Sequence, residues 1–177
     1  MYRDNSLTPT EAVRLAALGA LMEGDRRYDE LAAEIRGLIA RIVGPSLDLL
    51  GSSLELLRVE GLIRTLDNKD MGEASLLTLT EDGRAAFHSL IDSRVRAPMN
   101  DMSRLVIALK MRFLPLLDAE DQRDQLDMLA EAIEVDLARL RDLRPRAGQG
   151  YLADWLDLDI AQAQDRLAWF RALEARV

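Results

Sequence analysis

The chain lacks the residues on which much enzyme chemistry depends, since it has no cysteine and one histidine, His88. The missing thiols exclude disulfides, thiol catalysis and cysteine-ligated zinc or iron–sulfur sites. A single histidine argues against a histidine-rich metal site or a Ser-His-Asp triad, and we expect His88, beside Phe87, to be structural. Glycine-rich phosphate loops and nucleophile motifs are also missing. We therefore predict no enzyme activity, no metal and no cofactor.

Long apolar runs are missing as well. The first six residues contain no apolar signal region, and no later segment approaches the roughly 18 uncharged residues of a membrane span. The hydrophobic content of 49% nevertheless suffices for a core, and 177 residues allow one large or two small domains. We expect a soluble, cytoplasmic protein.

Positive charge is scarce. The chain has 23 basic and 31 acidic side chains, a net charge of −8, and only two of the basic residues are lysines. An acidic surface repels the phosphates that dominate DNA binding. Residues 1–96 and 97–177 are each net acidic, so any DNA binding must depend on a local cluster of basic side chains.

The most informative stretch runs from Leu54 to Arg84 and reads as helix, strand, turn, strand, helix. One face of the first helix is marked by leucines three and four apart: Leu47, Leu50, Leu54 and Leu57. Gly61 suits a left-handed helix end, residues 62–66 and 75–79 are β-capable runs, and Thr80 caps the next helix. This outline is a winged helix-turn-helix, which usually binds DNA.

Further helices flank this unit. A capping box at Thr8 to Glu11 starts the first helix at Pro9, and a second runs from Tyr28 to about Arg36 or beyond. Three amphipathic helices are expected after it, over residues 100–117, 120–143 and 151–175. We predict a mainly α fold with a winged helix-turn-helix carrying a two-stranded wing (1–96) and a three-helix dimerisation domain (97–177). A dimer would cover the apolar face that these helices leave exposed.

The third helix itself offers little for reading bases. Its face opposite the leucines carries Asp48, Leu49, Ser52, Glu55 and Leu56 and no basic residue. The cations that could reach phosphates lie around it: Arg26, Arg27, Arg58, Arg64 and Lys69. Each alone is more often a solvated surface charge. Ser46, Ser52 and Ser53 are candidate phosphate donors, or caps and solvent contacts.

Three motifs resemble the PadR family of bacterial transcriptional regulators over nearly the whole chain. They are Tyr28-Asp29-Glu30-Leu31, Leu57-Arg58-Val59-Glu60-Gly61-Leu62-Ile63 and Leu79-Thr80-Glu81-Asp82-Gly83-Arg84. The resemblance implies a homodimer held by the tail helices, and repression relieved by a small molecule. The expected dimer or effector pocket comprises Phe113, Trp155, Leu167, Trp169 and Phe170. The two tryptophans either line an effector pocket or simply fill the dimer core.

Two functions remain open from the sequence. The first is a dimeric repressor that uses the third helix in the DNA groove, with Arg64 and Lys69 on the wing contacting the backbone. The second is a winged-helix dimer with little DNA affinity that acts as a protein-interaction or ligand-sensing module through Leu49 and Leu56. Convergence of the five basic residues on one face would favour the first.

Overall fold

The computed structural model describes residues 6–44, 50–66 and 72–177, without the side chains of residues 50–52. Its elements follow in the order α1 (Pro9–Met22), β1 (Arg26–Arg27), α2 (Tyr28–Ile42), α3 (Leu50–Val59), β2 (Ile63–Thr65), β3 (Leu76–Leu79), α4 (Glu81–Ile91), α5 (Asp101–Phe113), η1 (Leu114–Leu116), α6 (Ala119–Leu143), η2 (Arg144–Ala147) and α7 (Tyr151–Glu174). The predicted fold class, a mainly α chain with a winged helix-turn-helix, is confirmed.

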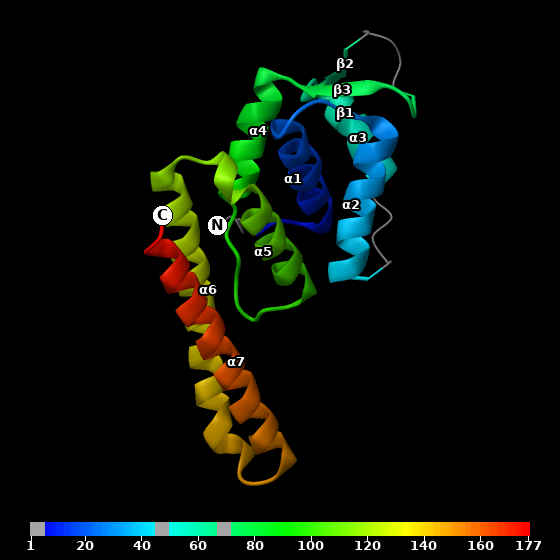
Figure 1. Cartoon of the computed structure of the whole chain (residues 1–177). Helices are drawn as coiled ribbons and strands as arrows, with labels where there is room; N and C mark the ends of the chain where they lie inside the picture. The colour runs from blue at the N-terminus through cyan, green and yellow to red at the C-terminus, as the bar shows by residue number, and fades with distance from the viewer. Residues whose placement is uncertain (1–5, 45–49, 67–71) are drawn as a thin grey trace, which may run out of the picture. The chain divides into compact units, whose positions relative to one another are not determined.

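The chain forms two compact units (Figure 1). The N-terminal unit comprises Met1–Ser93 together with Asp101–Leu116, and the C-terminal unit comprises Arg94–Asn100 together with Leu117–Val177. The helix that the sequence assigns to the tail, α5, therefore belongs by its contacts to the N-terminal unit. The C-terminal unit retains two long helices.

Helix α1 lies at the centre of the N-terminal unit, between α2 and α4 (Figure 1). The capping box predicted from the sequence is present, because the Thr8 hydroxyl accepts from the Glu11 amide while the Glu11 carboxylate accepts from the Thr8 amide. Most of the helix is buried on every side, from Ala12 to Leu21 with the exception of Arg14. It serves as the core element on which the other helices pack.

A three-stranded antiparallel sheet, in the order β1-β3-β2, lies at one end of this unit. Strands β2 and β3 form the wing, with Arg64 opposite Thr78, and β1 adds Arg26 opposite Leu77. The sequence predicts only the two strands of the wing and assigns no strand to Arg26 and Arg27. The third strand escapes detection because two residues show no alternation and their pairing is set by β3, fifty positions away.

Tight packing against α1 explains why α5 belongs to the N-terminal unit. A Cβ atom at Gly19 of α1 would lie 2.4 Å from the ring of Phe113, so only glycine leaves room for that ring. Phe113 is fully buried and meets Phe87 of α4 edge to face, with the ring centroids 6.0 Å apart. Phe113 is therefore a core residue of the N-terminal unit and not part of a pocket in the tail.

A buried lysine also ties α5 to α4. Lys110 has no exposed surface, and its Nζ donates a hydrogen bond to the carbonyl of Ile91 at the end of α4. A cation is favoured at the C-terminal end of a helix dipole, yet removal from water penalises the charged form. Burial lowers the pKa of Lys110 to about 8, while the neighbouring Asp92 acts in the opposite direction.

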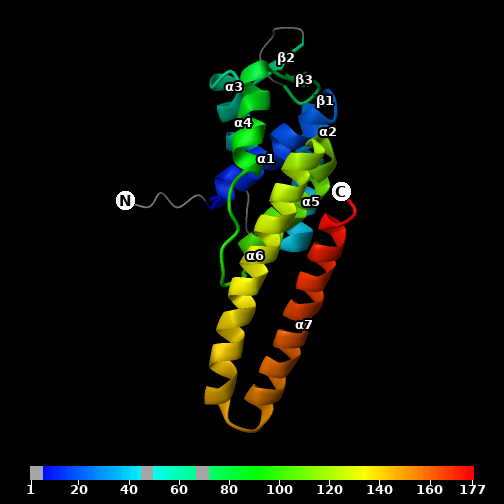
Figure 2. The same ribbon diagram turned by 90° about the vertical axis from the view of Figure 1, so that its left-hand side faces the viewer.

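The C-terminal unit is a hairpin of the helices α6 and α7, which run side by side in both views (Figures 1 and 2). Its core is built from Leu129, Ile133 and Leu137 of α6 and from Leu156 and Phe170 of α7. The segment 94–100 lies along α6, where the Met99 amide donates to Asp136 Oδ1 at 3.4 Å. Across the described ranges, no helix is both long and apolar enough to traverse a bilayer.

Candidate nucleic-acid interface

The end of α3 is fixed by the geometry of a Schellman motif. The Leu62 amide donates to the Leu57 carbonyl at 2.9 Å, and the Gly61 amide donates to the Arg58 carbonyl at 3.0 Å. Gly61 has a φ of 76°, a conformation that glycine adopts without steric cost. The chain consequently leaves α3 and enters the wing within a few residues.

The Leu-Thr-x-x-Gly motif packs directly on this turn. The Thr80 hydroxyl accepts from the Gly83 amide at 3.0 Å, and it lies 2.7 Å from the Gly61 carbonyl, to which it can donate. A Cβ atom on Gly83 would lie 2.1 Å from the Leu62 carbonyl oxygen. Two of the three motifs that carry the family resemblance, those at residues 57–63 and 79–84, therefore form one contact, which links the start of α4 to the junction between α3 and the wing.

The described surface of α3 is acidic and apolar. Leu54 and Leu57 are fully buried, as the predicted stripe requires, whereas Leu56 and Val59 are 46% and 73% exposed. Glu55 is exposed too, and its carboxylate accepts from Arg58 Nε at 3.1 Å. Arg58 is thus already bound to a carboxylate on the same helix, which reduces its availability for phosphate.

Arg26 belongs to a network of ion pairs inside the N-terminal unit. Arg26 Nε donates to the Ala20 carbonyl at 3.2 Å, and its Nη2 lies 2.9 Å from Glu23. Glu34 and Arg112 complete the network, and Arg112 contacts both carboxylates. These contacts join the end of α1, β1, α2 and α5. A phosphate would have to compete with Glu23 and Glu34 for the Arg26 guanidinium.

Arg27 is exposed but paired. Its Nε and Nη2 form a fork on the two carboxylate oxygens of Asp29, at 3.1 and 3.0 Å. This hydrogen bond raises the pKa of Arg27 and lowers the pKa of Asp29. A phosphate would have to compete with Asp29 for this guanidinium.

Arg64 differs from Arg26, Arg27 and Arg58, because it forms no ion pair within the described part of the chain. It stands on the exposed side of β2, opposite Thr78. Two further exposed leucines, Leu66 and Leu76, follow on the wing, where the Leu66 amide donates to the Leu76 carbonyl at 3.0 Å. Arg36 on α2 is also exposed and unpaired among the residues described, and no motif in the sequence marks it.

The predicted serine and lysine contacts have different outcomes. Ser53 is only 1% exposed, so it faces the core and does not reach a phosphate from this position. Ser46 and Lys69 lie outside the described residues, as does the side chain of Ser52. Of the basic residues predicted as a set, Arg64 is therefore the described one whose charge remains available.

In the C-terminal unit, the predicted pocket residues separate into buried and exposed groups. Phe170 is 2% exposed and packs inside the hairpin, whereas Trp155 and Trp169 are 57% and 53% exposed. Leu167 is partly exposed. Spacings of four, three and eleven place Tyr151, Trp155, Leu158 and Trp169 on one side of α7. We call these four residues the α7 stripe; they expose large apolar groups along most of the helix.

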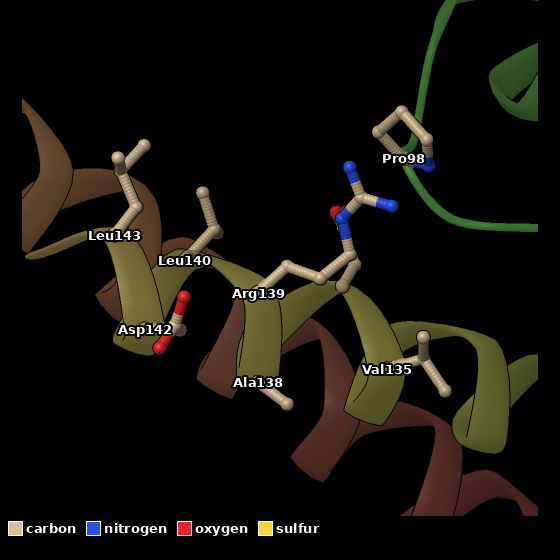
Figure 3. A pocket seen from close by; sticks show the side chains of 8 residues that line it. Pro98, Val135, Ala138, Arg139, Leu140, Asp142 and Leu143 are labelled. Atoms are coloured by element: carbon tan, nitrogen blue, oxygen red, sulfur yellow. The ribbon is translucent and has the colours of Figure 1, made fainter.

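A hollow of about 700 Å³ lies beside Pro98 on the outer side of α6 (Figure 3). Its lining is mainly apolar, including Val135, Leu140 and Leu143, and the Arg139 side chain extends towards Pro98. A second hollow of about 300 Å³ shares Val135 and lies beside residues 94–97. Neither hollow is lined by the aromatic residues that the sequence predicts for an effector pocket.

A protein-family model matches nearly the entire chain. Residues 2–174 match the family model of the AphA-like transcriptional regulator. No curated protein matches the sequence.

Solved structures give weaker likenesses. PadR from Bacillus subtilis in complex with p-coumaric acid is 15% identical, with a TM-score of 0.42 over 97% of this chain and 98% of that chain. The PadR-like transcriptional regulator from Bacillus cereus is 19% identical, with a TM-score of 0.41 over 92% and 94%. Bacillus subtilis PadR in complex with operator DNA is 18% identical, with a TM-score of 0.39 over 92% and 97%. Likeness at this level does not establish a shared ligand.

Proposed function

Because the chain belongs to the AphA-like family of transcriptional regulators, we propose that it binds operator DNA as a homodimer and represses transcription in the cytoplasm until a small molecule releases it. Family membership confirms the predicted PadR-like regulator and agrees with the prediction that the protein is not an enzyme. The observation that carries the DNA-binding part is the winged unit, in which Arg64 stands exposed and unpaired within the described residues, on the strand that follows α3.

Arg64 is suited to a phosphate because no carboxylate in the described chain has to be displaced from it. Phosphate contacts of this kind position a protein on the duplex and depend on salt, since each contact releases counterions. The net charge of −8 opposes long-range attraction, so the proposal requires a small number of local contacts. We expect modest affinity that falls as salt is added, with a slope of about 0.9 for each phosphate contact.

The test is anisotropy titration of a labelled duplex from the region upstream of the protein's own coding sequence, beside a shuffled duplex of the same composition. The proposal predicts tighter binding to the upstream duplex than to the shuffled one. Equal binding to both duplexes, or binding to neither, would contradict the operator-binding part.

The α7 stripe supports the homodimer. Monomeric proteins rarely leave so many large apolar side chains exposed along one helix, and such faces mark interaction surfaces. A second copy offers the same stripe, and a two-fold contact can bury both at once. Trp155 and Trp169 are the expected anchors, because aromatic residues dominate interface energetics. Sedimentation at several concentrations tests this part, and a concentration-independent monomer would contradict it.

The small-molecule part of the proposal rests on the hollow beside Pro98. The leucines and Val135 of its lining suit an apolar body, while the Arg139 guanidinium, unpaired within the described chain, and the carboxylates of Asp136 and Asp142 suit a polar end with both donors and acceptors. A panel of compact apolar molecules with such a polar end, added to the complex with the upstream duplex, is the probe. The variant Val135→Trp fills the hollow. If the added molecule no longer releases the duplex from this variant, the result supports this site; if it still releases the duplex, the result contradicts the site.

A second function is favoured by the surface of α3. Leu56, which the sequence predicts for this surface, and Val59 are exposed beside Glu55, a combination that suits a protein partner better than a polyanion. Leu49, the other leucine predicted for it, lies outside the described residues. In this alternative the dimer persists while DNA affinity is weak. Absent binding to the upstream duplex, combined with normal self-association, would favour the interaction module over the repressor.

A further inference from the structure

The C-terminal end of α3 is tied to α1 by a pair of charged side chains. Arg14 of α1 donates from Nη1 to Glu60 Oε1 at 2.9 Å, and its Nη2 binds the second carboxylate oxygen. Glu60 directly follows the last residue of α3, and the two partners are 46 positions apart in sequence. The side chains are 20% and 42% exposed, so the pair is shielded from water on the side of Arg14.

Glu60 is electrostatically misplaced without this partner. The C-terminal end of a helix carries partial negative charge, and a carboxylate there is unfavourable. Arg14 reverses this situation, because its hydrogen bond lowers the pKa of Glu60 and raises the pKa of Arg14. The two-bond geometry of a guanidinium on a carboxylate also fixes orientation, which a single ammonium contact would not do.

The same turn is held from a second side. The Thr80 hydroxyl lies 2.7 Å from the Gly61 carbonyl, and the Thr80 amide donates to the Leu62 carbonyl at 3.1 Å. Both α1 and the N-cap of α4 therefore bind the three residues after α3. α1 binds Glu60 through Arg14, and Thr80 at the start of α4 binds Gly61 and Leu62. The position of this turn sets where α3 ends and where the wing begins.

From this geometry we propose that Arg14 is a positioning residue for the DNA-binding surface. It holds Glu60, and through Glu60 the end of α3, while it neutralises a carboxylate that would otherwise repel phosphate. Arg14 itself contacts no DNA. The inference rests on the proposed DNA binding, since positioning is measured through affinity for the duplex.

The test measures affinity for the upstream duplex at several salt concentrations, using Arg14→Ala, Glu60→Ala, the double variant and Arg64→Ala. Arg14→Ala should weaken binding by roughly fivefold with an unchanged salt slope, because an interaction of this class is lost but no phosphate contact is. Arg64→Ala should make the slope shallower. In the Glu60→Ala background, the loss caused by Arg14→Ala should shrink to less than about twofold, because residues that act through each other are not additive.

Three results would overturn the inference. These are wild-type affinity in Arg14→Ala, the same loss in both backgrounds, or a slope in Arg14→Ala as shallow as in Arg64→Ala. Circular dichroism confirms that each variant is folded. If the wild-type protein binds no duplex, hydrogen exchange at the amides of residues 60–62 decides separately. Faster exchange in Arg14→Ala would support the positioning role of Arg14 and show that only the proposed DNA binding is wrong. Unchanged exchange would overturn the positioning role.

Discussion

Gly83→Ala should damage the junction on which the winged unit depends. The added methyl group would lie 2.1 Å from the Leu62 carbonyl oxygen and 2.7 Å from Leu79 Cδ1. Carbon and oxygen atoms in normal contact lie more than roughly 3 Å apart. The start of α4 must therefore move away from the turn by about 1 Å. That movement would also disturb the hydrogen bonds of Thr80 to Gly83 and Gly61.

The expected loss follows from two contributions. Overpacking a filled site typically costs about 1–3 kcal/mol, and loss of a helix cap costs about 1 kcal/mol. The greater helix propensity of alanine returns roughly 0.5–1 kcal/mol. The free energy of unfolding should therefore fall by about 1–3.5 kcal/mol, measured by urea denaturation followed by circular dichroism.

Gly37→Ala is the matched control for this experiment. Gly37 lies within α2, where the added methyl group would meet only the flexible end of the Arg41 side chain. The same substitution should here stabilise the protein by about 0.5 kcal/mol or more. The reasoning would be refuted if Gly83→Ala stayed within about 0.5 kcal/mol of the wild type, or if both variants changed stability equally.

Lys110→Met should change how stability depends on pH. With the pKa of Lys110 lowered to about 8 in the folded state, this lysine is charged in both states below pH 8 but loses its proton first in the folded state above it. Wild-type stability should therefore rise from pH 8 to 9.5 by about 2 kcal/mol relative to Lys110→Met, and parallel urea midpoints would contradict this. Trp169→Ala and Leu167→Asp should weaken self-association in sedimentation experiments, the first by tenfold or more, on the order of a hot-spot loss. Val59→Ala, which changes an exposed apolar residue on α3, is the control. Unchanged sedimentation of Trp169→Ala would exclude the α7 stripe as the dimer interface. Arg26→Ala should lower the free energy of unfolding by about 1 kcal/mol, and so the melting temperature by a few degrees, without changing the salt slope of DNA binding. An unchanged melting temperature with a shallower slope would make Arg26 a phosphate contact.

The parts of the fold that the sequence predicts are those encoded by local patterns. The leucine spacing, Gly61 and Thr80 each specify a backbone conformation within a few residues, and together they define the path from α3 to α4. The family resemblance depended on the same residues. The contact of Gly83 with Leu62 joins two of the three motifs, those at residues 57–63 and 79–84, in the folded chain.

The remaining features depend on partners distant in sequence. Lys110 looks like a surface residue until Ile91 is placed beside it, and α5 looks like a tail helix until Gly19 leaves space for Phe113. For the same reason, the sequence could not distinguish the engaged Arg26 from the available Arg64. Basic residues are easily counted, but their availability depends on which carboxylates the fold brings near.

The most direct test of the proposed function compares the salt dependence of DNA binding in the wild type, Arg64→Ala and Arg27→Ala. Each phosphate contact contributes about 0.9 to the slope of the logarithm of affinity against the logarithm of salt concentration. Arg64→Ala should therefore reduce the slope by about 1.8 for a dimer with two equivalent contacts. Arg27→Ala should change it little, because Asp29 already occupies that guanidinium. Equal slopes for Arg64→Ala and the wild type would contradict a wing that binds DNA through Arg64.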